Sequence, residues 1–344
     1  MAGKDLLPPS ELDEPASTGG GFPEPSATMV DERREPATYG FESLAAAEFP
    51  TYIMFDLTNR CNAKCIHCPQ STLYADNNQG RAFLPLETFR KAVDECKGKK
   101  IQFVRLTGDG EPFVHPKLFD MIDYAVKADI GPVGLTTNGS LMTAPKAERL
   151  VNSGLFMIDV SLDAYTDATY SIVRKGLNFA KTVENLEYLI AYRNRIKSPM
   201  KVMVSFVKQK ENAHEVEAFE KHWEKKVDKV LIRELISNVN QVSTEGSKGA
   251  APEKRWPCAH WWRRMVINFD GKLKPCPIDW TSGTAYKTLD EVSITDAWHS
   301  DFFSRHRMEH LNNNFSESSI CKNCPDWRGT PWNLGYEKVI RNLD

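Results

Sequence analysis

Three cysteines lie within eight consecutive positions of the chain. Cys61, Cys65 and Cys68 belong to the stretch CNAKCIHC, in which three and then two residues separate them. A structural zinc ion takes a closed set of four ligands, whereas three thiolates on an iron–sulfur cubane leave one iron open to another molecule. His67 is the one nearby residue that could complete a zinc set, but it is crowded between two of the cysteines. The spacing leaves open both a zinc knuckle and an iron–sulfur cluster with one accessible iron.

A second group of cysteines follows much later in the chain. Cys258, Cys276, Cys321 and Cys324 are four in number, and the last two form a CxxC pair. Four thiolates suit a closed metal site, and such soft ligands accept either zinc or an iron–sulfur cluster. The eighth cysteine, Cys96, falls near the end of an expected helix, where it is predicted to be a small packing residue.

The overall composition is that of an ordinary globular protein. The chain has 344 residues, a net charge of −2, 41% hydrophobic and 26% charged residues. These values give no support for nucleic-acid or membrane-surface binding, and no apolar run approaches the roughly 18 residues needed to cross a bilayer. The N-terminus lacks the apolar core of a secretory signal, so we expect a cytoplasmic protein whose cysteines bind metal rather than form disulfides.

Short apolar segments alternate with amphipathic helical segments between residues 50 and 236. The expected strands cover residues 52–57, 101–108, 132–139, 157–163, 200–207 and 229–235. The expected helices cover residues 85–98, 115–129, 144–154, 179–196 and 214–227. This alternation predicts an α/β fold, a partial (β/α)6 barrel of parallel strands with its chemistry at their C-terminal ends.

The pattern changes after residue 237. Residues 264–279 predict a β-hairpin around the Asp270-Gly271 turn, and residues 293–311 predict one helix. We therefore expect three parts: a disordered segment over 1–38, a barrel over 39–237, and a small β-hairpin/helix module over 238–344 that carries the second cysteine group and a C-terminal helix.

The first cysteine group, placed after the first strand of such a barrel, resembles that of the radical S-adenosylmethionine (radical SAM) enzymes. In that family the cofactor S-adenosyl-L-methionine binds the open iron of a [4Fe–4S] cluster, here implied to be held by the first three cysteines. The TGDGEP stretch resembles the family's glycine-rich motif. The resemblance implies that Gly108 and Gly110 let the backbone approach the cofactor, that Glu111 receives its ammonium group, and that Pro112 fixes the turn.

Other strand ends resemble the remaining cofactor contacts of that family. Ser161 and Asp163 in SLDA would contact the ribose, and Arg174 in VRKG would face the carboxylate. Asn138 would complete the pocket, and His67 would pack against the bound cofactor.

The second cysteine group, with its hairpin and CKNCPDW stretch, resembles the SPASM-type extension of radical SAM enzymes. Four cysteines imply one fully ligated auxiliary [4Fe–4S] cluster, with zinc as the alternative. The resemblance also implies a flavodoxin- or ferredoxin-type electron donor. It extends over about residues 50 to 330.

A fully ligated auxiliary cluster favours a role in electron transfer. The expected function is hydrogen abstraction by a 5′-deoxyadenosyl radical from a carbohydrate, aminocyclitol or nucleoside-like substrate. Dehydrogenation of an alcohol carbon is favoured, in natural-product or antibiotic biosynthesis. The alternatives are an epimerase, a decarboxylase of a sugar, a peptide-modifying maturase and a non-catalytic zinc or iron–sulfur scaffold.

Substrate contacts are expected from polar residues at the late strand ends and in the C-terminal module. Of the neighbours Arg233 and Glu234, one should face inward because adjacent strand residues point to opposite faces. The candidates are Ser205, Gln209, Arg233, Glu234 and Asp279.

Overall fold

The computed structural model describes residues 48–73, 82–244, 255 and 257–329. The predicted disordered segment over 1–38 lies outside these residues. Residues 38–344 form one compact unit, so the boundary expected near residue 237 falls inside it and stays a prediction. Among the described residues, no helix is both long and apolar enough to cross a membrane.

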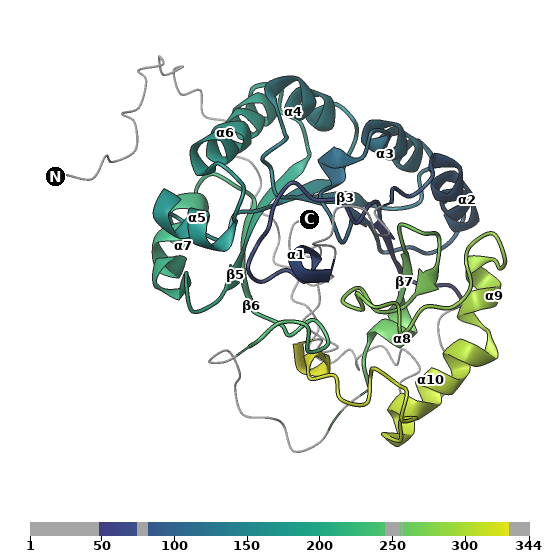
Figure 1. Cartoon of the computed structure of the whole chain (residues 1–344). Helices are drawn as coiled ribbons and strands as arrows, with labels where there is room; N and C mark the ends of the chain where they lie inside the picture. The colour runs from purple at the N-terminus through teal and green to yellow at the C-terminus, as the bar shows by residue number, and fades with distance from the viewer. Residues whose placement is uncertain (1–47, 74–81, 245–254, 256, 330–344) are drawn as a thin grey trace, which may run out of the picture. The chain divides into compact units, whose positions relative to one another are not determined.

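A single eight-stranded sheet, in the order β6-β5-β4-β3-β2-β1-β7-β8, organises the fold (Figure 1). The strands are β1 (Tyr52–Asp56), β2 (Phe103–Thr107), β3 (Val133–Thr137), β4 (Met157–Ser161), β5 (Lys201–Lys208), β6 (Lys229–Glu234), β7 (Arg264–Ile267) and β8 (Leu273–Lys274). The first six strands pair in parallel, as the sequence predicts. The α/β barrel expectation is confirmed.

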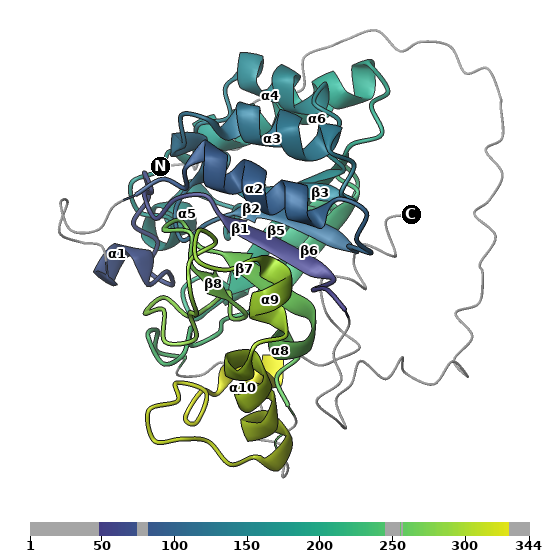
Figure 2. The same cartoon turned by 90° about the vertical axis from the view of Figure 1, so that its right-hand side faces the viewer.

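The predicted C-terminal hairpin joins the barrel sheet instead of standing apart. Strand β7 pairs in parallel with β1, and β8 pairs antiparallel with β7. Figure 2 shows β7 beside β1 and β8 beyond β7. Strand β1 therefore lies between β2 and a strand that follows it by about two hundred residues, a pairing that local pattern cannot indicate.

Helices follow the parallel strands and cover the outer face of the sheet (Figure 1). The five expected ones are α2 (Leu86–Cys96), α3 (Leu118–Lys127), α4 (Ala144–Val151), α6 (Phe179–Arg195) and α7 (Val216–Trp223). Their apolar residues recur with helical spacing. In α2 the buried residues are Phe89, Ala92, Val93 and Cys96, one stripe that faces the sheet.

Several short helices were not expected from the sequence. They are α1 (Gln70–Leu73), α5 (Asp167–Val173) and α8 (His260–Arg263), with 3-10 turns at Pro112–Val114, Ala213–Glu215 and Asp326–Gly329. The single helix expected over 293–311 is two helices, α9 (Ile294–Trp298) and α10 (Asp301–Asn312). Ser300 causes the break, because its side chain accepts a hydrogen bond from the Phe303 N–H and so caps α10.

The concave face of the sheet has an apolar layer and a polar layer. The apolar layer is a separate buried cluster, which contains Tyr52, Met54, Phe103, Met157, Met203 and Val266. Two residues further along the strands, the same face carries Asp56, Arg105, Asp159 and Ser205, because alternate strand residues share a face. The apolar layer closes one end of the barrel, and the polar layer lies at the C-terminal strand ends.

A buried ion pair joins β8 to β1. Lys274 Nζ lies 3.4 Å from Asp56 Oδ2, and the two side chains are 1% and 0% exposed. Lys274 Nζ also donates to the Asp279 carbonyl oxygen at 3.0 Å. Burial raises the pKa of Asp56 and outweighs the opposing effect of Lys274. Removing one partner would therefore leave an uncompensated charge in a dry environment.

We expect Lys274→Met to lower the free energy of unfolding by about 3–5 kcal/mol, the usual cost of breaking a buried pair. Adding Asp56→Leu should recover much of this loss, because the carboxylate that Lys274 pairs with is then removed as well. Urea unfolding of the iron-loaded protein, followed by tryptophan fluorescence, measures both effects.

Lys208→Met is the matched control. The 2.9 Å ion pair between Lys208 and Glu234 is exposed, so its loss should cost less than about 1 kcal/mol. Equal costs for the two lysines would contradict the role given to Lys274.

Candidate functional site

The first cysteine group lies in the loop between β1 and α1. Cys65 is buried, Cys61 and Cys68 are half-buried, and all three are free thiols. Burial raises the pKa of Cys61 and of Cys68 to about 12. Burial alone therefore favours the protonated thiols, and the positive iron ions of a bound cluster would be what stabilises three thiolates in one place.

The glycine-rich turn after β2 packs directly on this loop. Gly110 N donates to the Thr58 carbonyl oxygen at 2.8 Å, and Glu111 N donates to the Arg60 carbonyl oxygen at 2.8 Å. A Cβ on Gly110 would lie 2.0 Å from the Arg60 oxygen, and one on Gly108 would lie 2.7 Å from the Thr58 oxygen. The family resemblance predicts that these glycines let the backbone approach the cofactor. In the structure they also allow two backbone segments to lie in close contact.

Glu111 joins this turn to the end of β3. Its buried carboxylate accepts hydrogen bonds from Thr137 Oγ1 at 2.6 Å, Asn138 N at 2.8 Å and Phe113 N at 3.0 Å. The expected partner of Glu111 was the cofactor ammonium group, and the structure gives the carboxylate these three protein donors. Pro112 begins the 3-10 turn that follows, as a residue that fixes a turn should.

The side chain of Asn138 reaches the cysteine loop. Its Nδ2 donates to Asn62 Oδ1 at 3.0 Å, next to Cys61 in sequence. Its Oδ1 accepts from Ser140 N and Ser140 Oγ. Asn138 therefore lies beside the loop, as a pocket residue would, and holds it to the end of β3.

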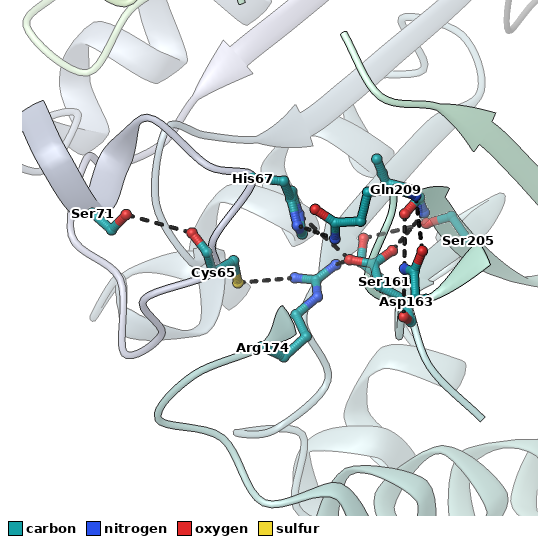
Figure 3. A network of polar contacts seen from close by, with 10 residues as sticks. Cys65, His67, Ser71, Ser161, Asp163, Arg174, Ser205 and Gln209 are labelled. Carbon is teal, nitrogen blue, oxygen red and sulfur yellow. Dashed lines mark hydrogen bonds and ion pairs between the residues drawn. The ribbon is translucent and has the colours of Figure 1, made fainter. Parts of the chain in front are cut away.

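Arg174, Asp163 and His67 form one buried network with a cysteine of the loop (Figure 3). Arg174 Nη2 lies 2.5 Å from Asp163 Oδ2, and Nη1 donates to Cys65 Sγ at 3.6 Å. His67 Nε2 lies 3.4 Å from the same Asp163 oxygen. Burial lowers the pKa of His67 to about 4. Asp163, the expected ribose contact, and Arg174, the expected carboxylate contact, thus form an ion pair with each other. Arg174 also contacts Cys65 of the cysteine loop directly.

One backbone N–H and one side-chain amide hold Asp163 in place. It has a φ of 60°, unusual for a residue with a side chain. Its Oδ1 accepts from Val207 N at 2.7 Å, and its carbonyl oxygen accepts from Asn212 Nδ2 at 2.8 Å. These bonds, from the end of β5 and the loop after it, offset the conformational cost, and the bond from Val207 fixes the direction of the carboxylate.

Two serines of neighbouring strands meet on the concave face. Ser161 and Ser205 are register partners in β4 and β5, and their hydroxyl oxygens lie 3.3 Å apart. Gln209, a further predicted contact, reaches His67 Nδ1 through its Nε2 at 3.2 Å. The structure therefore brings these polar candidates to the same end of the barrel as the cysteine loop (Figure 3).

The other substrate candidates have different surroundings. Arg233 faces inward, with its Nη2 2.9 Å from Asp159 Oδ2. Glu234 points to the opposite face, is 60% exposed and pairs with Lys208, so the structure does not bring it to the site. Asp279 organises its own loop, because its carboxylate accepts from Gly283 N, Thr284 N and Thr284 Oγ1.

The second cysteine group surrounds one pocket in the C-terminal module. The pocket is lined by all four thiols and by Val239, Arg255, His260, Trp261, Ile278, His310, Ile320, Asp326 and Trp327. Burial raises the pKa of Cys276 and raises that of Cys321 to about 12. Four thiols around a largely apolar pocket fit a fully ligated cluster. Among the described residues, no three His, Cys, Asp or Glu side chains meet around a single metal-ion position.

Several polar residues of these sites were missed by the sequence reasoning. Arg105 and Asp159 lie in the polar layer of the concave face, where Arg105 Nε donates to Thr136 Oγ1 at 3.0 Å. His310 and Arg255 line the second cysteine pocket. Strand alternation could have indicated the first two residues. The pocket residues have no local signal, since helix and loop pack around the cysteines only in the folded chain.

We expect Gly110→Ala to displace the first cysteine loop, because the added methyl group meets a backbone oxygen that cannot move aside. The cost should be about 3 kcal/mol, and iron bound after reconstitution should fall by about half as the three-cysteine cluster is lost. Unfolding curves and iron analysis measure the two effects.

Gly98→Ala is the matched control for this substitution. Gly98 has a φ of 71° with open space around it, so alanine there should cost only about 1 kcal/mol and leave the iron content unchanged. If Gly110→Ala also kept its full iron content, the close contact would not be what positions the loop.

Comparison with protein families and known proteins agrees with this geometry. The family model described as the Radical SAM superfamily matches residues 55–221. The model for SPASM, an iron–sulfur cluster-binding domain, matches residues 258–325. These ranges contain the first and the second cysteine groups, respectively. They imply S-adenosyl-L-methionine and two [4Fe–4S] clusters as cofactors.

Individual relatives differ in their described roles. The chain is 32% identical over 142 residues to the mycofactocin maturase MftC of Mycobacterium ulcerans, which is 41% of this chain and 37% of that protein. Streptococcus suis SuiB bound to its precursor peptide SuiA has a similar fold, with a TM-score of 0.63, 16% identity and coverage of 87% and 74%. BtrN in complex with AdoMet and 2-DOIA has a TM-score of 0.53, 15% identity and coverage of 80% and 92%.

Proposed function

The chain belongs to the radical SAM superfamily and carries a SPASM domain, and we propose on that basis that it oxidises an alcohol carbon of a small polar substrate. When bound, the cofactor and the two clusters supply hydrogen-atom abstraction and one-electron transfer. Oxidation of a carbinol to a ketone removes one hydrogen atom, one proton and one electron from the substrate. We expect a flavodoxin- or ferredoxin-type protein as the electron donor.

The location of the cysteines is the observation that carries this proposal. Seven of the eight belong to the two cluster sites, and the eighth, Cys96, is 0% exposed in the core between α2 and the sheet. An epimerase must return a hydrogen atom to the opposite face of the substrate carbon, typically from a thiol. Cys96 packs on the outer face of the sheet, away from the concave face, so the arrangement of thiols favours net oxidation.

The polar layer of the concave face supports a substrate with several hydroxyl or amino groups. Ser161 and Ser205 present two hydroxyls side by side, and the Arg233–Asp159 pair presents charge of both signs. The apolar layer beneath them, which contains Met157 and Met203, limits the access of water from that side. These groups would orient the substrate carbon by hydrogen bonds.

A peptide-modifying maturase is the second candidate function. The similarity to MftC, which is described as a maturase, and to SuiB, which binds a precursor peptide, favours it. The fold relation to BtrN is compatible with the small-molecule proposal, since that structure holds 2-DOIA. The same radical chemistry serves both, so the substrate distinguishes them.

Anaerobic turnover in deuterated water tests the proposed oxidation. Panels of aminocyclitols, hexoses and nucleosides, and separately of short peptides, are each incubated with the iron-loaded protein and S-adenosyl-L-methionine. We expect a small-molecule product that is lighter by two hydrogens and carries no solvent deuterium on carbon. Cys96→Ser should give the same product at a similar rate. Deuterium on one substrate carbon would indicate epimerisation, and turnover of peptides alone would establish the maturase function.

Arg233 and Glu234 offer a test of which strand face binds substrate. Arg233→Gln should lower kcat/KM by about tenfold to a hundredfold, equivalent to about 1.4–2.8 kcal/mol, because Asp159 loses the nearer of its two arginine partners, Arg233 at 2.9 Å and Arg105 at 4.0 Å. Glu234→Gln should leave kcat/KM unchanged, since its side chain is on the other face. Substrate-dependent formation of 5′-deoxyadenosine provides the measurement. If Glu234→Gln lowered kcat/KM more than Arg233→Gln did, the substrate would lie outside the barrel.

A further inference from the structure

His310 lies among the cysteines of the second group. It belongs to α10, is 4% exposed, and lines the same pocket as Cys258, Cys276, Cys321 and Cys324. Its ring meets that of Phe315 edge-on, with centroids 4.9 Å apart and an interplanar angle of 86°. The ring is therefore held in one orientation by packing.

The hydrogen bonds of His310 determine where its proton lies. The backbone N–H of Cys258 donates to His310 Nδ1 at 3.3 Å. A ring nitrogen that accepts a hydrogen bond carries no proton, so the proton of this imidazole is on Nε2. Nε2 is consequently a donor and has no lone pair with which to ligate a metal.

That donor has no acceptor among the residues that the structure describes. Nε2 is buried, and none of the described side chains or backbone groups accepts a hydrogen bond from it. A buried N–H without an acceptor costs about 1–3 kcal/mol, and native proteins rarely leave one unsatisfied. Because His310 lines the thiol-bearing pocket, the acceptor should be a group that this pocket binds.

We propose that His310 Nε2–H donates a hydrogen bond to a sulfur atom of the auxiliary cluster and raises its reduction potential. Reduction adds negative charge to the cluster sulfurs, so a donor stabilises the reduced state more than the oxidised one. His310 would thus make the cluster a better electron acceptor. This role is independent of the substrate and holds for either function considered above.

The experiment uses the full-length chain with Cys61, Cys65 and Cys68 replaced by Ala, so that the auxiliary cluster alone is reconstituted. A redox titration followed by electron paramagnetic resonance gives its reduction potential. We expect His310→Phe to lower the ratio of reduced to oxidised cluster about tenfold at a fixed solution potential, which corresponds to about 59 mV for a one-electron couple. His310→Gln, which restores an N–H near the same position, should return the potential most of the way to that of the parent.

His306 provides the matched control, one turn earlier on α10. It stacks on Trp261 with centroids 4.5 Å apart and an interplanar angle of 8°, and its Nδ1 bonds to the Phe302 carbonyl oxygen. His306→Phe should therefore leave the potential unchanged. An unchanged potential in His310→Phe at full iron content would overturn the proposal. Loss of the auxiliary iron in both His310 variants, but not in His306→Phe, would also overturn it, by showing that His310 ligates or supports the cluster.

Discussion

The arrangement of the first metal site depends on the close approach of two backbone segments. The turn after β2 contacts the cysteine loop through Gly110 N and Glu111 N, at a separation that leaves no space for a side chain on Gly110. Glu111 then fastens the same turn to Thr137 and Asn138 at the end of β3. Three consecutive strand ends are thereby fixed to one another, and the loop that carries the three thiols is tied to them.

Much of the barrel could be predicted from the sequence, because its signals are local. The apolar strands, the helical spacing of Phe89 to Cys96 and the cysteine spacings are each contained in a short segment. The pairing of β7 with β1 could not be predicted, since it joins segments about two hundred residues apart. The break before α10 had a visible signal in Ser300, a residue that is preferred at helix starts.

The site was predicted well in location and less well in the partners of its side chains. Position along a strand indicates the edge at which a residue lies, and it places Ser161 and Asp163 at the end of β4. Arg174 follows α5 and reaches the same place by its contact with Asp163 (Figure 3). Position along a strand does not indicate which charged group a side chain meets. Arg174 meets Asp163 and Cys65, and Arg233 meets Asp159, because burial makes an unpaired charge costly and folding brings these ions together. His310 had no sequence signal, because the role proposed for it rests on its buried Nε2, which has no hydrogen-bond acceptor among the described residues.

The continuity of the sheet has a consequence for how such a protein can diversify. The first cysteine loop leaves the end of β1, and Cys276 follows β8 within two residues, so both metal sites are attached to one hydrogen-bonded sheet. Strand pairing therefore determines the distance between the two sites, and the side chains that line the barrel have little influence on it. Under the proposed function, residues of the polar layer could therefore be exchanged during evolution, and a new substrate admitted, without altering the distance between the two cysteine groups.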